Sequence, residues 1–472
     1  MSDREIWQAS ACDTANMIAQ GQVSARDVVA AHIARMQDKN PHLNAVVDDL
    51  STSAMAEAAA LDETFARSGP VGSLHGVPVT IKENIDQKGH ATPNGVVGFK
   101  DLIAPADSPF VTNLKQAGAV VIGRTNTPEF SFRGTTDNPL HGRTFNPWND
   151  WASAGGSSGG AASAVMAGIG SIAHGNDIGG SLRFPATCCG AATVKPGLGR
   201  TPAYNPSQMA ERGILAQITS VQGVICREVR DVRLSMQSAI GYSPSDPWQV
   251  PMPWEGPALE GPIKVGFTRD SYGFDLDPAV DLALSTARAA LEDAGYIVEE
   301  ITPPNVLEIG QEATRTLFGE VKATLSDVMR THGSAEFNTY FDHCFDIAPP
   351  YEGDDLLAAY ARRAGFVRAW QELLAAYPLV LTPFLLAPTY AHGRDYEGRE
   401  GAAEIMQLGF YSFAMNYMGL PAGNIPANYN DGLPVGVQIV GRRFREDLIL
   451  DACEAVEDRV GIMAHKLFAR DG

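Results

Sequence analysis

Cysteine is scarce in this sequence of 472 residues: there are six, scattered without a Cys-x-x-Cys pair. Such spacing supports neither a disulfide framework nor a zinc site, and it fits a reducing compartment. The adjacent residues Cys188 and Cys189 are expected to be small buried side chains rather than a redox pair.

Positive charge is also in short supply. The 36 Lys and Arg residues stand against 55 Asp and Glu residues, which gives a formal net charge of −19. Such a chain repels the phosphates of nucleic acids unless it carries a basic patch. The densest basic stretch, residues 441–445, is short and is followed by Glu446 and Asp447. The sequence therefore predicts no nucleic-acid partner.

Long apolar runs are missing as well. No segment approaches the roughly 20 apolar residues that a membrane-spanning helix needs, so no membrane association is expected. Residues 1–7 lack the charged-then-apolar layout of a secretory signal. These absences predict a cytoplasmic protein.

What the sequence does contain is an alternation of short apolar runs and amphipathic helical patterns. The clearest runs are residues 77–81, 119–123, 263–267 and 435–440, and the clearest helical patterns are 110–116, 278–294 and 447–455. This rhythm predicts an α/β fold with a largely parallel sheet. Because neither a repeat nor a low-complexity linker is present, residues 1–472 are expected to form a single domain. Within it, residues 305–400 are expected to form a helical excursion that lines the substrate site.

Two glycine-rich segments are the most informative features: Gly-Gly-Ser-Ser-Gly-Gly at 155–160 and Asp-Ile-Gly-Gly-Ser-Leu-Arg-Phe-Pro at 177–185. Glycine permits unusual backbone conformations and lets N–H groups point into an open site. A phosphate-binding loop would end in Gly-Lys-Ser/Thr, whereas two alanines follow Gly160. The Gly-x-Ser-x-Gly turn of α/β-hydrolases fits residues 155–159, but that turn follows a buried strand. Residues 146–151 have a loop sequence instead.

The interpretation that uses all these elements is acyl transfer by a serine. Lys82 ends an apolar run, where burial would lower its pKa from about 10.4 and favour the neutral amine that a base requires. Ser157 could relay a proton between Lys82 and Ser181. Backbone N–H groups that converge on one point would stabilise a tetrahedral oxyanion, each typically by about 3 kcal/mol. The expected donors are those of Ile178, Gly179, Gly180 and Ser181.

Taken together, these motifs resemble the amidase signature family. The resemblance covers most of the chain, in segments 76–84, 125–130, 146–148, 155–160, 177–185, 195–196, 419–422 and 432–438. It implies a Ser–cisSer–Lys triad: Ser181 is the nucleophile, Ser157 bridges through a cis peptide bond, and Lys82 is the final base. It also implies one α/β/α domain around a central mixed, twisted sheet flanked by helices. Hydrolysis of carboxylic amides without metal or cofactor is implied as well.

The resemblance leads to two enzymatic hypotheses. The first is a free-standing serine amidohydrolase that cleaves a small or aryl carboxamide through an acyl-enzyme, with esters and carbamates as further candidate substrates. The second is a glutamine-amidotransferase subunit that supplies ammonia to a partner. Such subunits tend to have threonine and glutamine at the positions of Ile178 and Phe184, which favours the first. The complete triad argues against a third hypothesis, a catalytically silent binding protein. A homodimer is expected only from base rates.

The remaining candidates receive a structural interpretation. Asp177 and Arg183 are expected to hold the serine loop by ion pairing, and Ser158 by hydrogen bonding. His174 is expected to be packed rather than to act as a base. Four aromatic residues either line an acyl pocket or pack in the core: Phe130, Phe132, Trp148 and Trp151.

Overall fold

A computed structural model describes residues 5–471, and a mixed sheet of eleven strands lies at its centre. The strands follow the order β1-β3-β2-β4-β6-β5-β10-β11-β9-β7-β8. Their bounds are β1 Val46–Asp49, β2 Pro78–Lys82, β3 Val120–Thr125, β4 Ile172–Asp177, β5 Ala192–Lys195, β6 Val221–Cys226, β7 Lys264–Phe267, β8 Ile297–Glu300, β9 Leu379–Pro383, β10 Ala422–Asn430 and β11 Leu433–Gly441.

The directions of the strands correct one expectation. Parallel pairing joins β2 to β3 and β4, and β7 to β8 and β9. Every other neighbouring pair in this sheet is antiparallel. The expected largely parallel sheet is therefore wrong, while the mixed sheet implied by the family resemblance is confirmed. Three of these antiparallel pairs involve a hairpin late in the chain: Asp431 and Gly432, both with positive φ, make the tight turn that joins β10 to β11. This hairpin lies between β5 and β9.

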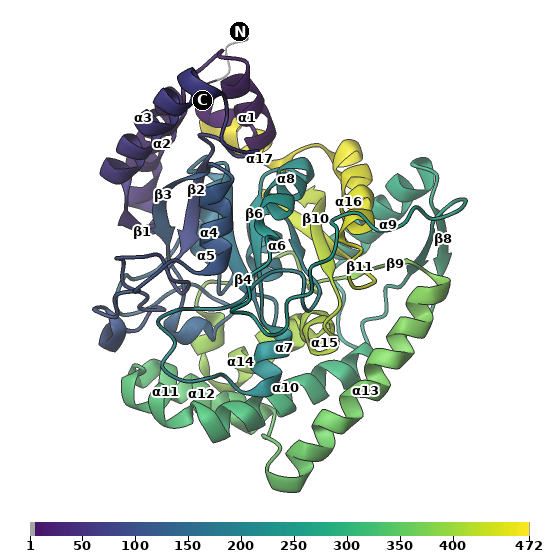
Figure 1. The fold of residues 1–472 in the computed structure, drawn as a ribbon. Helices are drawn as coiled ribbons and strands as arrows, with labels where there is room; N and C mark the ends of the chain where they lie inside the picture. Colours follow the sequence, from purple (N-terminus) through teal and green to yellow (C-terminus); the bar gives the residue numbers. More distant parts are fainter. Residues whose placement is uncertain (1–4, 472) are drawn as a thin grey trace.

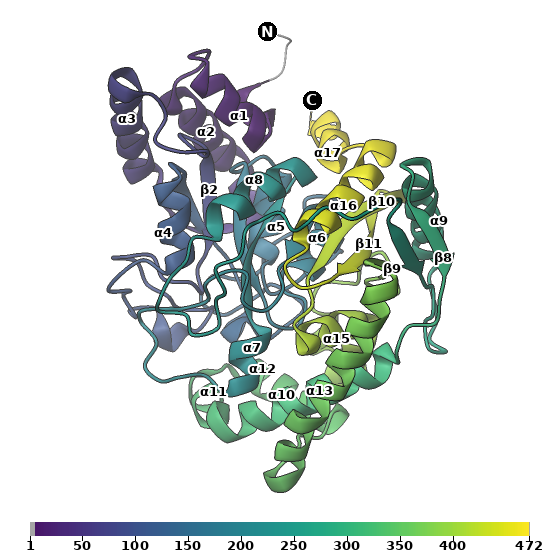
Figure 2. The same ribbon diagram turned by 45° about the vertical axis from the view of Figure 1, so that its right-hand side comes forward.

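Helices cover both faces of the sheet (Figures 1 and 2). They are α1 Ala11–Ala19, α2 Ala25–Leu43, α3 Ser51–Ser68, α4 Pro109–Gln116, α5 Gly159–Met166, α6 Arg183–Cys189, α7 Ile214–Thr219, α8 Val229–Ala239, α9 Pro278–Asp293, α10 Val306–Thr324, α11 Ser326–His332, α12 Ala335–Ile347, α13 Gly353–Ala376, α14 Gly398–Leu408, α15 Phe410–Met418, α16 Glu446–Val460 and α17 Met463–Asp471.

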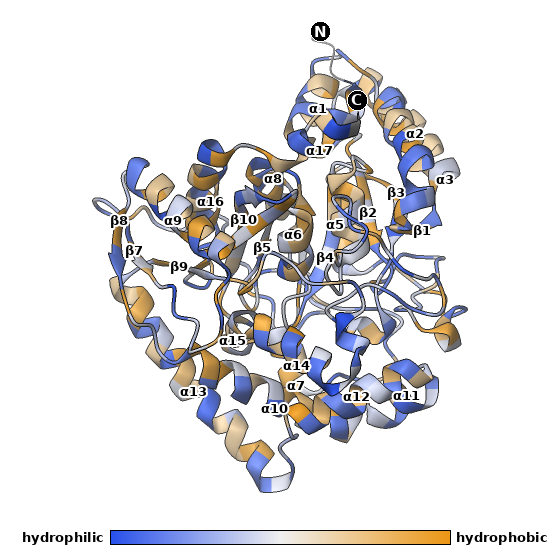
Figure 3. Ribbon diagram, turned by 180° about the vertical axis from the view of Figure 1, so that it is seen from behind, coloured by the Kyte–Doolittle hydropathy of each residue, from blue (hydrophilic) through white to orange (hydrophobic). Residues whose placement is uncertain are grey.

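The core divides between the two faces because side chains alternate along a strand. Ile172 of β4 and Val224 of β6 belong to the buried cluster that also contains residues of α4, α8, α9 and α16, whereas their neighbours Ala173 and Ile225 belong to the cluster with residues of α5, α6 and α17. Figure 3 shows hydrophobic residues concentrated on the strands, whereas α2 and α13 alternate polar and apolar residues. None of the described helices is both long and apolar enough to cross a membrane.

Helices α10–α14 form a layer below one edge of the sheet (Figure 1). The expected excursion, residues 305–400, is thus largely helical, although it also contributes β9 to the sheet. Two sets of polar contacts attach this layer to the loop after β3, one partly buried and one buried. The Glu129 carboxylate accepts hydrogen bonds from the N–H (2.8 Å) and hydroxyl (2.7 Å) of Ser334, which caps α12. Arg133 donates two hydrogen bonds of 2.9 Å to Asp395.

Candidate active site

The two parallel neighbours β2 and β4 end at the same edge of the sheet and begin the site. Lys82 is the last residue of β2, and the loop that carries Ser181 directly follows β4. The carboxyl ends of parallel strands commonly leave a crevice of this kind. The N–H of Ser158, just before α5, donates to the carbonyl of Ser181 at 3.2 Å. The two glycine-rich segments thus lie side by side.

The segment before α5 is a loop and follows no strand, so the strand–turn context of an α/β-hydrolase is absent. The Gly156–Ser157 peptide bond is cis. Gly156 has no room for a side chain, because a Cβ there would lie 2.6 Å from the carbonyl carbon of Gly134 and against the carbonyl oxygen of Arg133. Ser157 itself is 1% exposed.

Lys82 reaches Ser157 from the end of β2. Its amine is buried and lies 2.6 Å from the Ser157 hydroxyl and 2.9 Å from Oδ1 of Asn176. Burial lowers the pKa of Lys82 well below 10.5, and the nearby carboxylates of Asp177 and Glu83 only partly oppose this. The environment therefore favours the neutral amine, which is the form that can accept a proton.

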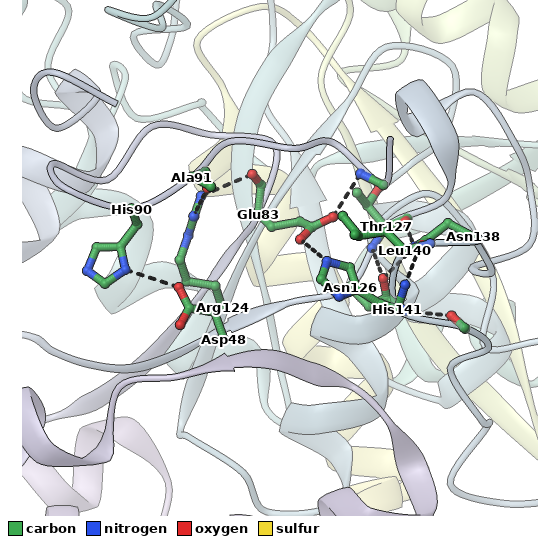
Figure 4. Close-up of polar contacts among 12 residues, drawn as sticks. Asp48, Glu83, His90, Ala91, Arg124, Asn126, Thr127, Asn138, Leu140 and His141 are labelled. Atoms are coloured by element: carbon green, nitrogen blue, oxygen red, sulfur yellow. Dashed lines mark hydrogen bonds and ion pairs between the residues drawn. The ribbon is translucent and has the colours of Figure 1, made fainter. Parts of the chain in front are cut away.

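The chain beyond Lys82 is held by a separate polar network (Figure 4). The buried Arg124 guanidinium donates to the carbonyls of Glu83 (3.0 Å) and Ile85 (2.8 Å), and also to the carbonyl of Ala91. The Glu83 carboxylate accepts the N–H of Gly95 at 2.8 Å and lies 2.9 Å from Nε2 of His141. Glu83 is therefore occupied by these two groups and makes no hydrogen bond to the Lys82 amine among the described residues.

Asp177 organises the loop that contains Ser181. Its buried carboxylate accepts hydrogen bonds from the N–H groups of Gly180 (2.7 Å) and Leu182 (3.1 Å), from Arg183 (3.0 and 3.1 Å) and from Asn416 (2.8 Å). Burial alone would raise the pKa of Asp177, but the charge and hydrogen bonds of Arg183 outweigh it and lower the pKa to about 2. The Asp177–Arg183 pair thus fixes both ends of the loop.

The same contacts bear on the oxyanion donors. The N–H of Gly180 points to Asp177, so it is engaged in holding the loop. The N–H groups of Ile178, Gly179 and Ser181 donate to no protein acceptor within residues 5–471, and these residues are half-exposed. These three N–H groups are therefore open to an acceptor in the cavity. The ring of Phe413 lies close to Gly179, since a Cβ there would lie 2.8 Å from its Cε1 atom.

Ser181 is one of the residues that line a largely apolar cavity of about 670 Å³, a volume that includes the open mouth. Gly156, Ile178 and Gly179 also line it. The walls come from the loop after β3, from α10, α12, α14 and α15, and from the start of α6: Phe132, Phe184, Leu317, Phe318, Tyr340, Cys344, Ile405, Met406 and Phe413. Ile405 and Met406 lie just beyond the expected excursion of 305–400.

The four aromatic candidates occupy different environments in the structure. Phe132 lines the cavity. Phe130 packs against Phe337 with ring centroids 5.1 Å apart. Trp148 is buried and donates to the carbonyl of Cys189 at 2.7 Å, and Trp151 is 51% exposed.

His174 is a packed residue. Its Nδ1 accepts the backbone N–H of Lys82 at 3.3 Å, and its Nε2 lies 3.0 Å from Oε1 of Gln222. Burial lowers the pKa of His174 to about 3, so the ring is neutral. Cys188 and Cys189 are both fully buried, as expected.

Sequence reasoning missed three asparagines of the site. Asn176 contacts the amine of Lys82, Asn84 pairs with Asn176, and Asn416 bonds to Asp177. Asn416 could have been found, because it is the only amide side chain in the apolar helix α15. Asn84 follows β2 and Asn176 is the second-last residue of β4, and neither belongs to a recognisable motif of its own.

Known proteins of similar sequence and structure are available for comparison with this fold and site. An indoleacetamide hydrolase of Bradyrhizobium diazoefficiens is 47% identical over 464 residues, which cover 98% of this chain and 88% of that protein. A glutamyl-tRNA(Gln) amidotransferase subunit of Moorella thermoacetica is 29% identical and covers 96% of the chain and 97% of its own length. A solved bacterial aryl acylamidase of the amidase signature family superposes with a TM-score of 0.84 at 25% identity, covering 97% of this chain and 98% of its own.

These likenesses define the class of protein: the chain is an amidase, a hydrolase that acts on carbon–nitrogen bonds. The family model described as Amidase matches residues 27–450. The chain therefore belongs to the amidase signature family, and it is more similar to a free-standing hydrolase than to the amidotransferase subunit.

Proposed function

We propose that this protein hydrolyses aryl-acetamides, with indole-3-acetamide as the leading candidate, through an acyl-enzyme on Ser181. The observation that carries the proposal is the 2.6 Å contact between the buried amine of Lys82 and the hydroxyl of Ser157, beside the loop of Ser181. The substrate class is supported by the aromatic walls of the cavity. It is also supported by the 47% identity to an indoleacetamide hydrolase.

In the first half of the proposed reaction, the Ser181 oxygen attacks the amide carbonyl carbon. Its proton passes to the Ser157 oxygen while the Ser157 proton passes to the Lys82 amine. The carbonyl oxygen becomes an oxyanion that accepts hydrogen bonds from the N–H groups of Ile178, Gly179 and Ser181. Collapse breaks the carbon–nitrogen bond, and the amine leaves as ammonia after receiving the proton back through Ser157.

In the second half, water attacks the Ser181 ester and the same relay moves its proton. The acid is released and the free serine is restored. The aryl group would meanwhile lie against Phe132 and Phe318, whose rings are 5.9 Å apart and belong to the cavity wall. Apolar walls with few polar groups suit an uncharged aromatic acyl chain.

The test is a panel of indole-3-acetamide, phenylacetamide, the matching methyl esters and carbamates, and glutamine. Wild type is expected to cleave the aryl-acetamides, and Ser181→Ala is expected to lose at least 10³-fold in kcat/KM, a typical cost of removing a nucleophile. Full activity of Ser181→Ala on every substrate that wild type cleaves would show the mechanism to be wrong.

The alternative, an ammonia-supplying amidotransferase subunit, rests on the 29% relative. It predicts glutaminase activity that depends on a co-purifying partner, whereas the hydrolase acts alone on aryl-acetamides.

The oligomeric state is a separate question. Light scattering during size-exclusion chromatography measures whether the protein is the homodimer expected from base rates.

A further inference from the structure

The amine of Lys82 has two hydrogen-bonding neighbours of different chemistry. Ser157 has a hydroxyl, which can donate or accept, but Oδ1 of Asn176 can only accept. The 2.9 Å contact to Asn176 therefore uses one N–H of the amine. A neutral amine has two N–H groups and one lone pair, so fixing an N–H limits where the lone pair can point.

The orientation of Asn176 is itself fixed. Its Nδ2 donates to Oδ1 of Asn84 at 2.9 Å, and Nδ2 of Asn84 donates back to Oδ1 of Asn176 at 3.2 Å. Nδ2 of Asn84 also donates to the hydroxyl of Ser131 at 2.8 Å. Turning over either amide alone would bring two N–H groups or two oxygens together. Turning over both together would remove the donor that Asn84 supplies to Ser131, whose own proton goes to Oδ1 of Asn94 at 2.6 Å. The cyclic pair and Ser131 together therefore keep the oxygen of Asn176 toward Lys82.

We infer that Asn176, held by Asn84, is a positioning residue that turns the lone pair of the Lys82 amine toward the hydroxyl of Ser157. This inference rests on the proposed function, in which Ser157 transfers its proton to Lys82. When that transfer occurs, the Ser157 O–H bond breaks, a third N–H bond forms on Lys82, and Asn176 continues to accept one N–H.

The charges around Lys82 show why a neutral amide suits this position. The carboxylate of Asp177 is paired with Arg183, and that of Glu83 contacts His141. His174, which contacts the backbone of Lys82, is neutral. The two groups in direct contact with the amine, Ser157 and Asn176, are both uncharged. Asn176 thus supplies an acceptor without adding a negative charge that would hold the lysine protonated.

The test is the pH dependence of kcat and of inactivation by a fluorophosphonate probe, between pH 5 and 10. Asn176→Asp places a carboxylate next to the amine, which favours the ammonium form. Its acidic limb is expected to move up by about 1 to 3 pH units. Asn176→Ala removes the acceptor, and its plateau rate is expected to fall by up to about tenfold, with no upward movement of the limb.

The matched control is Asn113→Asp, an equally half-buried asparagine of α4 whose amide donates to the carbonyls of Ala239 and Gly241. The pH profile of this control should keep its acidic limb at the wild-type position. The inference is overturned if the acidic limb of the pH profile does not move in folded Asn176→Asp. It is also overturned if the plateau rate of Asn176→Ala equals that of wild type, and this second result decides the matter if the aspartate variant fails to fold. Failure of the proposed function is a different result: wild type itself would neither hydrolyse aryl-acetamides nor react with the probe at Ser181.

Discussion

A methyl group on Gly156 would displace the backbone that carries Ser157, because the space around Gly156 is already filled. In Gly156→Ala the new Cβ would lie 2.6 Å from the carbonyl carbon of Gly134, and ordinary contacts begin at 3.4 Å. The backbones must therefore separate by at least about 0.8 Å, because the carbonyl oxygen of Arg133 would be closer still. Because the obstacle is backbone rather than a flexible side chain, the displacement passes to the adjacent Ser157. Displacements near 1 Å in a reacting group cost on the order of 10²-fold in rate.

The assay is kcat/KM on indole-3-acetamide together with the rate of fluorophosphonate labelling, since both require the relay. Gly365→Ala is the matched control: Gly365 lies inside α13, and a Cβ there would meet nothing within 4 Å. That control should keep full activity and gain up to about 1 kcal/mol of stability from helix propensity. Activity of Gly156→Ala within threefold of wild type, in a protein whose fold is intact, would refute the reasoning.

Three further predictions follow from the site. In wild type, kcat should rise with pH along a limb whose midpoint lies well below 10.5, because burial lowers the pKa of Lys82 and only the neutral amine accepts a proton. A pH series on Lys82→Met should show neither this limb nor turnover. Asp177, whose pKa is lowered from 3.8 to about 2, should contribute about 2 to 3 kcal/mol of stability above pH 4, which is lost progressively as the pH falls to 2 and below. Urea unfolding at pH 7 and pH 3 should show about 1 kcal/mol of this loss, and a smaller one in Asp177→Asn. Phe318→Ala should widen the cavity and lower KM for bulkier naphthyl-acetamides relative to phenylacetamide, and an unchanged KM ratio would show that Phe318 does not define the aryl site.

The extent of sequence-based prediction differs between the site and the sheet. The chemical groups could be proposed because glycine next to serine is a local pattern, and Lys82 ends a recognisable apolar strand. The direction of the strands could not, because it depends on partners far apart in the chain. Ala422 of β10 pairs with Lys195 of β5, and Val437 of β11 with Pro383 of β9. Periodicity within each segment carries no information about such pairing.

Within the site, the sequence is least informative where one group has two potential partners. The N–H of Gly180 is one of the predicted oxyanion donors, and in the structure it donates to Asp177 three residues earlier. Similarly, Asn176 carries no motif of its own, and its relation to Lys82 arises only because β2 and β4 are neighbours. These are competitions between hydrogen-bond partners, and three-dimensional geometry decides them.

The central claim is that Ser181 forms the covalent intermediate while Ser157 relays protons. The most direct measurement is tandem mass spectrometry of the enzyme after labelling with a fluorophosphonate, or after quenching during turnover of a methyl ester of an arylacetic acid. We expect a single adduct on Ser181 that disappears in Lys82→Met. An adduct on Ser157, or turnover of the ester with no adduct on either serine, would contradict it.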